Sequence, residues 1–175
     1  MELQKIAFLE TFTMEENGGI MGGILVTDAD TKPIEFRVTA PIKPSSFQKT
    51  LYGDVLHEHI LVELISVPLL SAINEQIDVI LVKDPFFLGA NNKQGIRVVR
   101  VMNEDDEQKN GKSAQELAST NGHPKTFVET SKKFESELAE IKTKLSPIAE
   151  HRNLIEPFDR LKAACEQVHL QKTSE

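Results

Sequence analysis

The sequence has no tryptophan and a single cysteine, Cys165, among its 175 residues. One thiol cannot form an intramolecular disulfide, so a small secreted fold held together by disulfides is excluded. The sequence also shows no segment with the pattern of a signal peptide, and no obvious apolar run long enough to cross a bilayer. These absences predict a cytoplasmic protein with no membrane partner.

Basic residues are also in deficit, with 20 Lys and Arg against 27 Asp and Glu and a formal net charge of −7. Nucleic-acid binding neutralises phosphates with Lys and Arg, so this acidic balance argues against autonomous, nonspecific binding to nucleic acid. A local basic patch remains compatible with the composition. The length suits one domain with an appendage.

The stretch from residue 44 to residue 84 carries the strongest structural pattern. Ser45 and Ser46 predict the start of a helix, because a serine side chain can accept hydrogen bonds from the first free N–H groups. Residues 60–73 are apolar almost all round, which predicts a helix buried on more than one side. The continuous β-branched run at residues 77–82 predicts an interior strand covered on both faces.

Four other segments have the composition of strands, namely residues 5–12, 22–27, 33–40 and 95–101. Placed around the central helix and strand, they give the order β-β-β-α-β-β. The sequence therefore predicts an α/β (α+β) fold with a mixed sheet of about five strands and a C-terminal helical hairpin or tail.

Composition changes after residue 101. Residues 102–124 are rich in Asn, Glu, Asp, Lys, Ser and Gly and nearly lack large apolar side chains, which is typical of a flexible linker. Residues 125–175 have helical periodicity. We therefore expect an α/β sheet domain at 1–101, a flexible linker at 102–124 and a helical C-terminal segment at 125–175.

The helical C-terminal segment carries a narrow apolar stripe with spacings of three and four residues. An apolar stripe that follows a flexible linker is a common design for binding another protein. We therefore predict a protein partner, or self-association through the C-terminal helices. The stripe consists of Phe134, Leu138, Ile141, Leu145, Ile148, Ile155, Phe158, Leu161 and Val168.

Three carboxylates, Glu10, Asp28 and Asp84, lie near predicted strand ends. Nucleases that use hard cations need carboxylates that converge from neighbouring strands, so these residues are the candidate catalytic set, with Mg²⁺ or Mn²⁺ as cofactor. The alternative interpretation is structural and involves no cofactor. It makes Asp28 a turn former, Asp84 a turn starter before proline, and Glu10 a solvated strand residue.

A second polar group lies on the predicted helix. His59 and Glu63 are four residues apart and can share a helix face, but two ligands are too few for a metal site. His57 points nearly the opposite way from His59. We interpret the group as a polar patch and expect Glu63 to pair with Arg37 or Arg97.

The segments at residues 68–73 (PLLSAI) and 78–84 (DVILVKD) resemble the helix-then-strand core of the endonuclease V family, and the element order resembles the ribonuclease-H-like fold. The resemblance places Glu10 where the family has an aspartate on its first strand. Residues 85–87 (PFF) replace the family's glycine-rich turn, and residues 51–53 (LYG) are at most a counterpart of its proline–tyrosine wedge. The resemblance implies a degenerate nuclease fold.

Two functions from different classes follow from these observations. The lack of a complete catalytic motif, together with the apolar stripe, predicts a non-catalytic subunit or adaptor of a cytosolic multi-protein complex, linked to nucleic-acid processing or phage defence. Nucleic acid would then be only an indirect partner. The alternative is a metal-dependent ribonuclease-H-like nuclease that uses Glu10, Asp28 and Asp84.

Overall fold

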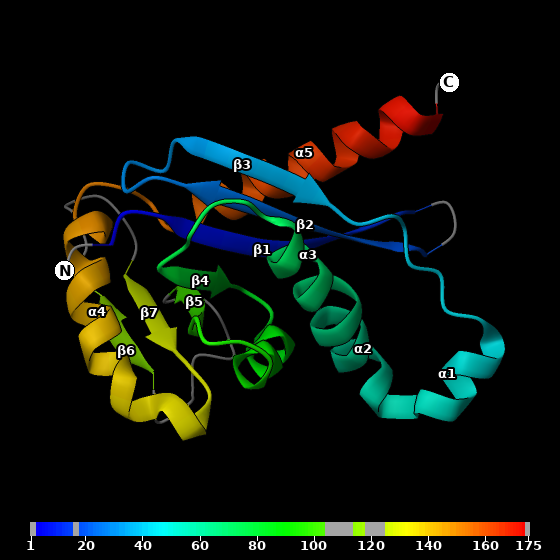
Figure 1. The fold of residues 1–175 in the computed structure, drawn as a ribbon, viewed down its shortest axis with the longest axis horizontal. Coiled ribbons are helices and arrows are strands. Elements are labelled where there is room, and N and C mark those ends of the chain that lie inside the picture. The colour runs from blue at the N-terminus through cyan, green and yellow to red at the C-terminus, as the bar shows by residue number, and fades with distance from the viewer. Residues whose placement is uncertain (1–2, 16–17, 104–113, 118–124, 174–175) are drawn as a thin grey trace.

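A mixed β-sheet organises the molecule, as the computed structural model shows for residues 3–15, 18–103, 114–117 and 125–173 (Figure 1). Within this part of the chain, seven strands follow the order β3-β2-β1-β4-β5-β7-β6. The α/β class is confirmed, although the sheet has two more strands than expected. The strands are β1 (Ile6–Thr13), β2 (Ile20–Thr27), β3 (Pro33–Val38), β4 (Val79–Val82), β5 (Val98–Asn103), β6 (Gln115–Leu117) and β7 (Thr126–Glu129).

Strand β4 lies at the centre of the sheet, parallel to β1 on one side and to β5 on the other. All four of its residues are buried, as the apolar run predicted. The strand begins at Val79 rather than at residue 77. Just before it, the Asp78 side chain accepts hydrogen bonds from the N–H groups of Gln4 and Lys5. The pairing of Leu9 with Val82 sets the register of the two parallel strands.

A long, irregular helical connection leads from β3 to β4. It comprises α1 (Ser46–Tyr52), the 3₁₀ turn η1 (Gly53–Val55), α2 (Leu56–His59), the π-helical η2 (Ile60–Ser66) and α3 (Val67–Ala72). Ser45 and Gln48 form a capping box at its start, and Gly53 ends α1 with a φ of +53°. The wide π turns lie directly before Pro68, which supplies no N–H to an α-helical ladder.

The segment from Ser46 to Ala72 is long and apolar enough to cross a membrane by length and composition, with a hydropathy of 1.4. This corrects the expectation that the chain has no such run. In the folded chain, Ile60, Leu61 and Ile65 are buried with the apolar side chains of β1 and β4. Of the segment's most apolar window, 33% is buried inside the fold.

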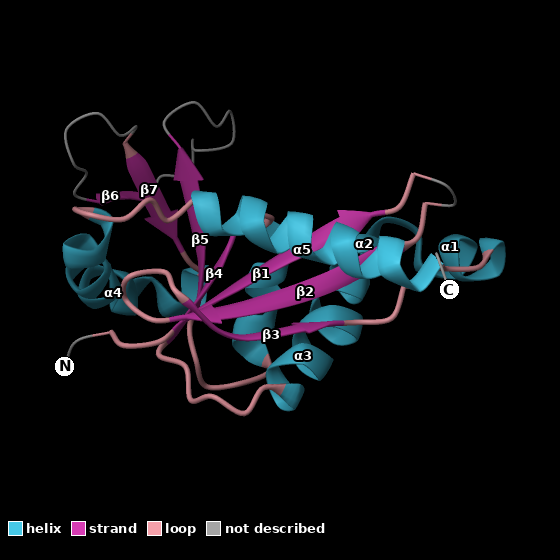
Figure 2. Ribbon diagram, turned by 90° about the horizontal axis from the view of Figure 1, so that it is seen from above, coloured by secondary structure: helices cyan, strands magenta, loops and turns pink. Residues whose placement is uncertain are grey.

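Two further helices, α4 (Glu135–Ala149) and α5 (Glu156–Thr173), cover the opposite face of the sheet. Figure 2 shows α5 lying across β1 and β2 on the side away from α3. Phe158 of α5 meets Phe8 of β1 edge-to-face, with 5.2 Å between the ring centroids. The molecule thus has three layers, with an apolar cluster on each face of the sheet.

Most of the apolar stripe predicted to bind a partner is buried in the apolar cluster that α4 and α5 form with the sheet. Leu138, Leu145, Ile148, Phe158 and Leu161 are buried. The remaining stripe residues, Phe134, Ile141, Ile155 and Val168, are partly buried. The chain's own sheet covers the stripe, which removes the reason for expecting a partner there.

The predicted division at residues 101 and 124 does not coincide with a boundary in the core. Strand β6 lies within the segment expected to be a linker, and it pairs with β7 in the common sheet. Residues 104–113 and 118–124 of that segment lie outside the described residues. Side chains from both predicted parts, such as Val101 and Leu145, belong to one apolar cluster.

Two adjacent glycines let the helical layers approach β2 closely from both sides. A Cβ atom at Gly22 would collide with Ile65 of η2. A Cβ atom at Gly23, on the other face, would lie 2.5 Å from Sγ of Cys165 in α5. This glycine pair therefore serves the packing of three layers.

We predict that Gly22→Ala lowers the free energy of unfolding by about 1–3 kcal/mol, because overpacking forces neighbouring side chains and backbone to shift. Gly95→Ala is the matched control, since nothing lies within 4 Å of the added Cβ and its φ is not positive. Urea denaturation measures both variants. Equal midpoints for the two variants would contradict the close approach of η2 to β2.

Candidate active site

Glu10 and Asp84 lie at the same edge of the sheet. Glu10 follows Leu9 in β1, and Asp84 lies two residues beyond Val82, the partner of Leu9 in β4. The carboxyl ends of parallel neighbours face the same edge, which accounts for this shared position of the two carboxylates. They lie within electrostatic range of each other, because the charge of Asp84 acts on Glu10.

The environment of Glu10 favours its protonated form. Burial raises the pKa of its carboxyl group above the usual 4.5, and the negative charge of Asp84 adds to that rise. The N–H of Thr11, which donates to Oε1 at 3.0 Å, opposes the rise, as do the nearby charges of Lys83 and Lys162. Burial is the largest of these effects. Glu10 is therefore not the solvated strand residue of the structural interpretation.

Asp84 is anchored through both of its carboxylate oxygens. Oδ1 accepts a hydrogen bond from the N–H of Phe86 at 2.9 Å and caps the 3₁₀ helix η3 (Pro85–Asn92). Oδ2 lies 2.9 Å from Nε2 of His57 in α2. Asp84 is thus the turn starter that the sequence predicted and also a member of the carboxylate pair.

His57 joins the site through this contact with Asp84. With Nε2 committed to the carboxylate, the other ring nitrogen, Nδ1, is the one left to act on a ligand. The ring of Phe86 meets the His57 ring at 83°, with 5.2 Å between the centroids, and thereby restricts its orientation. A carboxylate that orients an imidazole in this way is a common arrangement for acid–base work.

Asp28 does not belong to this site, and the prediction that it joins Glu10 and Asp84 is wrong. β2 runs antiparallel to β1, and Thr27 pairs with Ile6, so Asp28 lies at the opposite end of the sheet. That places it roughly 16 Å from Glu10 along the strand. Its Oδ1 accepts hydrogen bonds from the N–H groups of Asp30 and Lys32, as a turn former does.

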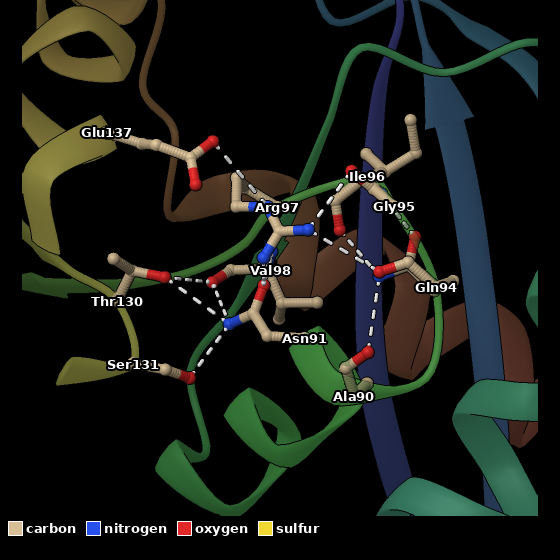
Figure 3. A network of polar contacts seen from close by, with 10 residues as sticks. All are labelled: Ala90, Asn91, Gln94, Gly95, Ile96, Arg97, Val98, Thr130, Ser131 and Glu137. Atoms are coloured by element: carbon tan, nitrogen blue, oxygen red, sulfur yellow. Dashed lines mark hydrogen bonds and ion pairs between the residues drawn. The ribbon is translucent and has the colours of Figure 1, made fainter. Parts of the chain in front are cut away.

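The buried Asn91 belongs to η3, the 3₁₀ helix that Asp84 caps, and bonds it to neighbouring elements (Figure 3). Its Nδ2 donates to the carbonyl oxygen of Val98 at 3.0 Å and to the hydroxyls of Thr130 and Ser131. Its Oδ1 accepts from the N–H of Val98 at 2.7 Å. One side chain therefore ties η3 to β5 and to the residues that follow β7.

The cationic side chain of Arg97 extends the same network, because it donates a hydrogen bond to Oδ1 of Asn91. The guanidinium of Arg97 lies 3.6 Å from the centre of the Phe134 ring. Its Nε lies 3.9 Å from Oε1 of Glu137 (Figure 3). These contacts join β5 to α4. The polar network thus connects the element that positions Asp84 with α4.

We predict that Asn91→Ala lowers the free energy of unfolding by about 1–3 kcal/mol, because it leaves buried backbone groups of Val98 without their partner. Asn92→Ala, at the exposed neighbouring position, is the control and should denature like the wild type. Chemical denaturation measures both. If Asn91→Ala unfolds like Asn92→Ala, the network does not support η3.

A cavity of about 440 Å³ lies next to His57. Lys43 and Lys49 contribute positive charge to its lining, and Asp54 contributes one negative charge. The helix beside it exposes three apolar side chains, with Phe47 70%, Leu51 65% and Val55 60% exposed. The cavity lining includes His57, the partner of Asp84, but neither Glu10 nor Asp84 itself.

The other residues weighed as ligands do not form a site. Glu63 pairs with Lys93 at 2.8 Å rather than with Arg37 or Arg97, and His59 packs against the ring of Tyr52. Burial and the nearby Glu10 raise the pKa of the Cys165 thiol to about 12, which keeps it un-ionised, as is typical of a buried structural cysteine. Within the described part of the chain, no three His, Cys, Asp or Glu side chains gather as a metal cluster.

The residue that sequence analysis missed is His57. The sequence pattern placed this histidine in a polar patch, because its partner lies 27 residues away along the chain. A helical wheel compares residues within one helix and cannot reveal a contact with a strand end. The only available signal was the unusual triplet His57–Glu58–His59 at the edge of an apolar helix.

Solved structures of endonuclease V share this fold. The enzyme from Streptomyces avermitilis aligns with a TM-score of 0.67 and 12% identity over 99% of this chain and 85% of that chain. Endonuclease V from Ciona intestinalis, in complex with DNA containing an inosine followed by a ribo-adenosine, aligns with a TM-score of 0.60 and 13% identity over 98% and 87%. The Bacillus subtilis enzyme gives 0.60 and 11% over 99% and 83%.

No protein-family model and no curated protein matches the sequence. The structural likeness confirms the ribonuclease-H-like fold and the resemblance to endonuclease V. Because these neighbours are nucleases, the prediction of a non-catalytic subunit or adaptor is wrong, and the alternative prediction of a nuclease is favoured. Identities of 11–13% establish the fold alone, so the activity enters below as a proposal.

We predict that Glu10→Gln stabilises the protein at about pH 8 but not at about pH 4. A carboxyl group with a raised pKa in the folded state binds its proton more tightly there than in the unfolded chain. Its contribution to stability is complete below the usual pKa and is lost as the pH rises through the raised value. Glutamine stays neutral and avoids that loss.

Denaturation of the wild type and of Glu10→Gln at the two pH values measures this difference. Glu166→Gln, at an exposed position of α5, is the control for removing one negative charge. A stability difference between the wild type and Glu10→Gln that does not change with pH would show that burial of Glu10 does not disfavour its charge.

Proposed function

We propose that this chain is a nuclease that hydrolyses phosphodiester bonds in a nucleic acid and works in the cytoplasm. One observation carries the proposal: Glu10 and Asp84 lie at the carboxyl ends of two adjacent parallel strands, with His57 held on Asp84. Ligand sites of open α/β sheets lie at this edge. The fold shared with endonuclease V supports the same conclusion.

Mg²⁺ or Mn²⁺ is the cofactor that this donor set fits best. Mg²⁺ is often bound through one or two carboxylates, with water and substrate phosphate completing its shell, and Glu10 and Asp84 supply two. Both Asp84 oxygens already accept one hydrogen bond, but a carboxylate oxygen has a second lone pair. A cation held there would polarise a phosphoryl oxygen. Among the described residues no group of three or more such ligands gathers, so water and substrate phosphate would have to supply the rest of the cation's shell.

The chain's own groups supply the remaining chemistry. His57, oriented by Asp84, is placed to accept or donate a proton at Nδ1. Lys83 and Lys162 bring positive charge close to Glu10 and can offset the negative charge of a bound phosphate.

The surface beside His57 offers contacts for the rest of a nucleic-acid strand. Lys43 and Lys49 can neutralise phosphates, and the exposed ring of Phe47 can stack on a base. The net charge of −7 restricts favourable contact with nucleic acid to such local basic positions. The surface therefore favours a single strand or a locally opened duplex, whose bases are accessible.

The test is cleavage of labelled single-stranded and double-stranded DNA and RNA by the purified protein with Mg²⁺ or Mn²⁺. We expect Asp84→Asn and Glu10→Gln to lower the rate by about 10²–10⁴-fold, as loss of a group that acts directly in catalysis does. Asp28→Asn is the matched control, because Asp28 lies at the other end of the sheet, and it should cleave at the wild-type rate.

Two outcomes would overturn the proposal. One is the absence of cleavage of all four substrates by the wild type with either cation. The other is cleavage that survives in Asp84→Asn and Glu10→Gln at the rate of Asp28→Asn, which would place the activity elsewhere or in a contaminating nuclease.

A further inference from the structure

We infer that the chain forms a two-fold symmetric dimer in which β3 of one copy pairs antiparallel with β3 of a second copy. β3 is the outermost described strand on its side of the sheet, with β2 as its neighbour (Figure 2). Open edge strands are templates for pairing with another strand, and proteins usually protect them. This surface is distinct from the C-terminal helices, and the inference does not depend on the nuclease proposal.

The backbone of β3 presents its free hydrogen-bonding groups at Phe36. The N–H of Thr39 donates to the carbonyl oxygen of Gly22 in β2 at 2.9 Å. Backbone direction alternates along a strand, so Arg37 and Glu35 also direct their N–H and C=O groups toward β2. Phe36 and Val38 then direct theirs outward, away from the sheet.

The side chains of β3 also favour an apolar contact at this edge. Phe36 pairs with Leu25 of β2, on the face covered by α5, and remains 38% exposed. Its neighbour Ile34 is 41% exposed. A β-bulge beside Val26 and Thr27 shifts the register near Ile34, so the regular part of the edge is short and centred on Phe36.

Charge complementarity identifies the occupant of the edge as a second copy. If a two-fold axis passes Phe36, antiparallel pairing places Phe36 opposite Phe36, and Glu35 of each copy opposite Arg37 of the other. These two residues lie on the same face and already form an ion pair within one chain, with 2.7 Å between Arg37 Nε and Glu35 Oε2. The dimer would extend this pair into a ring of four alternating charges.

The dimer leaves the candidate active site accessible. β3 is separated from β1 by β2, and Glu10 and Asp84 lie at the ends of β1 and β4. Pairing through β3 would join two sheets edge to edge, with the two sites on separate copies. The short regular segment predicts a dimer that dissociates on dilution rather than a permanent one.

Charge-reversal variants test the pairing by sedimentation equilibrium. Glu35→Arg makes both charged positions of β3 basic, and Arg37→Glu makes both acidic. Each variant alone should dimerise more than about 10-fold more weakly than the wild type, since like charges then lie opposite each other. An equimolar mixture of the two variants should form a mixed dimer, because opposite charges again face each other across the axis.

A second variant separates pairing from folding. Glu35 also accepts hydrogen bonds from the N–H groups of Asn74 and Glu75, so circular dichroism must first show that Glu35→Arg is folded. Phe36→Pro removes the central outward N–H, while an edge strand tolerates proline at such a position. It should be monomeric and folded. A protein concentration of about 100 μM is high enough to populate a weak dimer. A wild type that is monomeric at that concentration would overturn the inference. So would a variant mixture that stays monomeric.

Discussion

The parallel pairing of β1 with β4 is the constraint on which the rest of the molecule depends. It buries both strands between two helical layers, with α3 and η2 on one face and α5 on the other. The same register brings Glu10 and Asp84 to one edge of the sheet, so core packing and site assembly follow from a single alignment. The glycines of β2 then allow the two layers to approach closely enough to close the core around this pair of strands.

The sequence predicted the elements whose side-chain pattern repeats, and it missed those without such a pattern. The apolar run of β4 and the apolar helix before it were recognisable because both are buried on several sides. β6 and β7 contain only seven residues between them, mostly polar, and they become strands because β5 offers an edge for pairing. The stripe on α4 and α5 was located correctly, but periodicity alone does not reveal whether a partner or the chain's own sheet covers it.

The same distinction applies to the candidate site. A carboxylate at the end of a strand is visible in the sequence, and Glu10 and Asp84 were found in that way. Strand direction is not visible, so Asp28 appeared equivalent although β2 runs antiparallel to β1 and takes it to the far end. His57 was overlooked for a related reason, since its contact with Asp84 joins a helix to a strand end and follows no local spacing.

Glu10 places a carboxylate at a position where the fold does not require one. Burial opposes ionisation of Glu10 more strongly than Lys83 and Lys162 favour it, and the residue lies among apolar strand neighbours that an apolar side chain could join. A group whose ionised form is disfavoured by its surroundings is typical of a functional site, where some stability is lost for the sake of activity. Asp84 differs, because it also caps η3 and would be kept for structure alone. Glu10 is therefore the stronger indication that this edge of the sheet acts on a ligand.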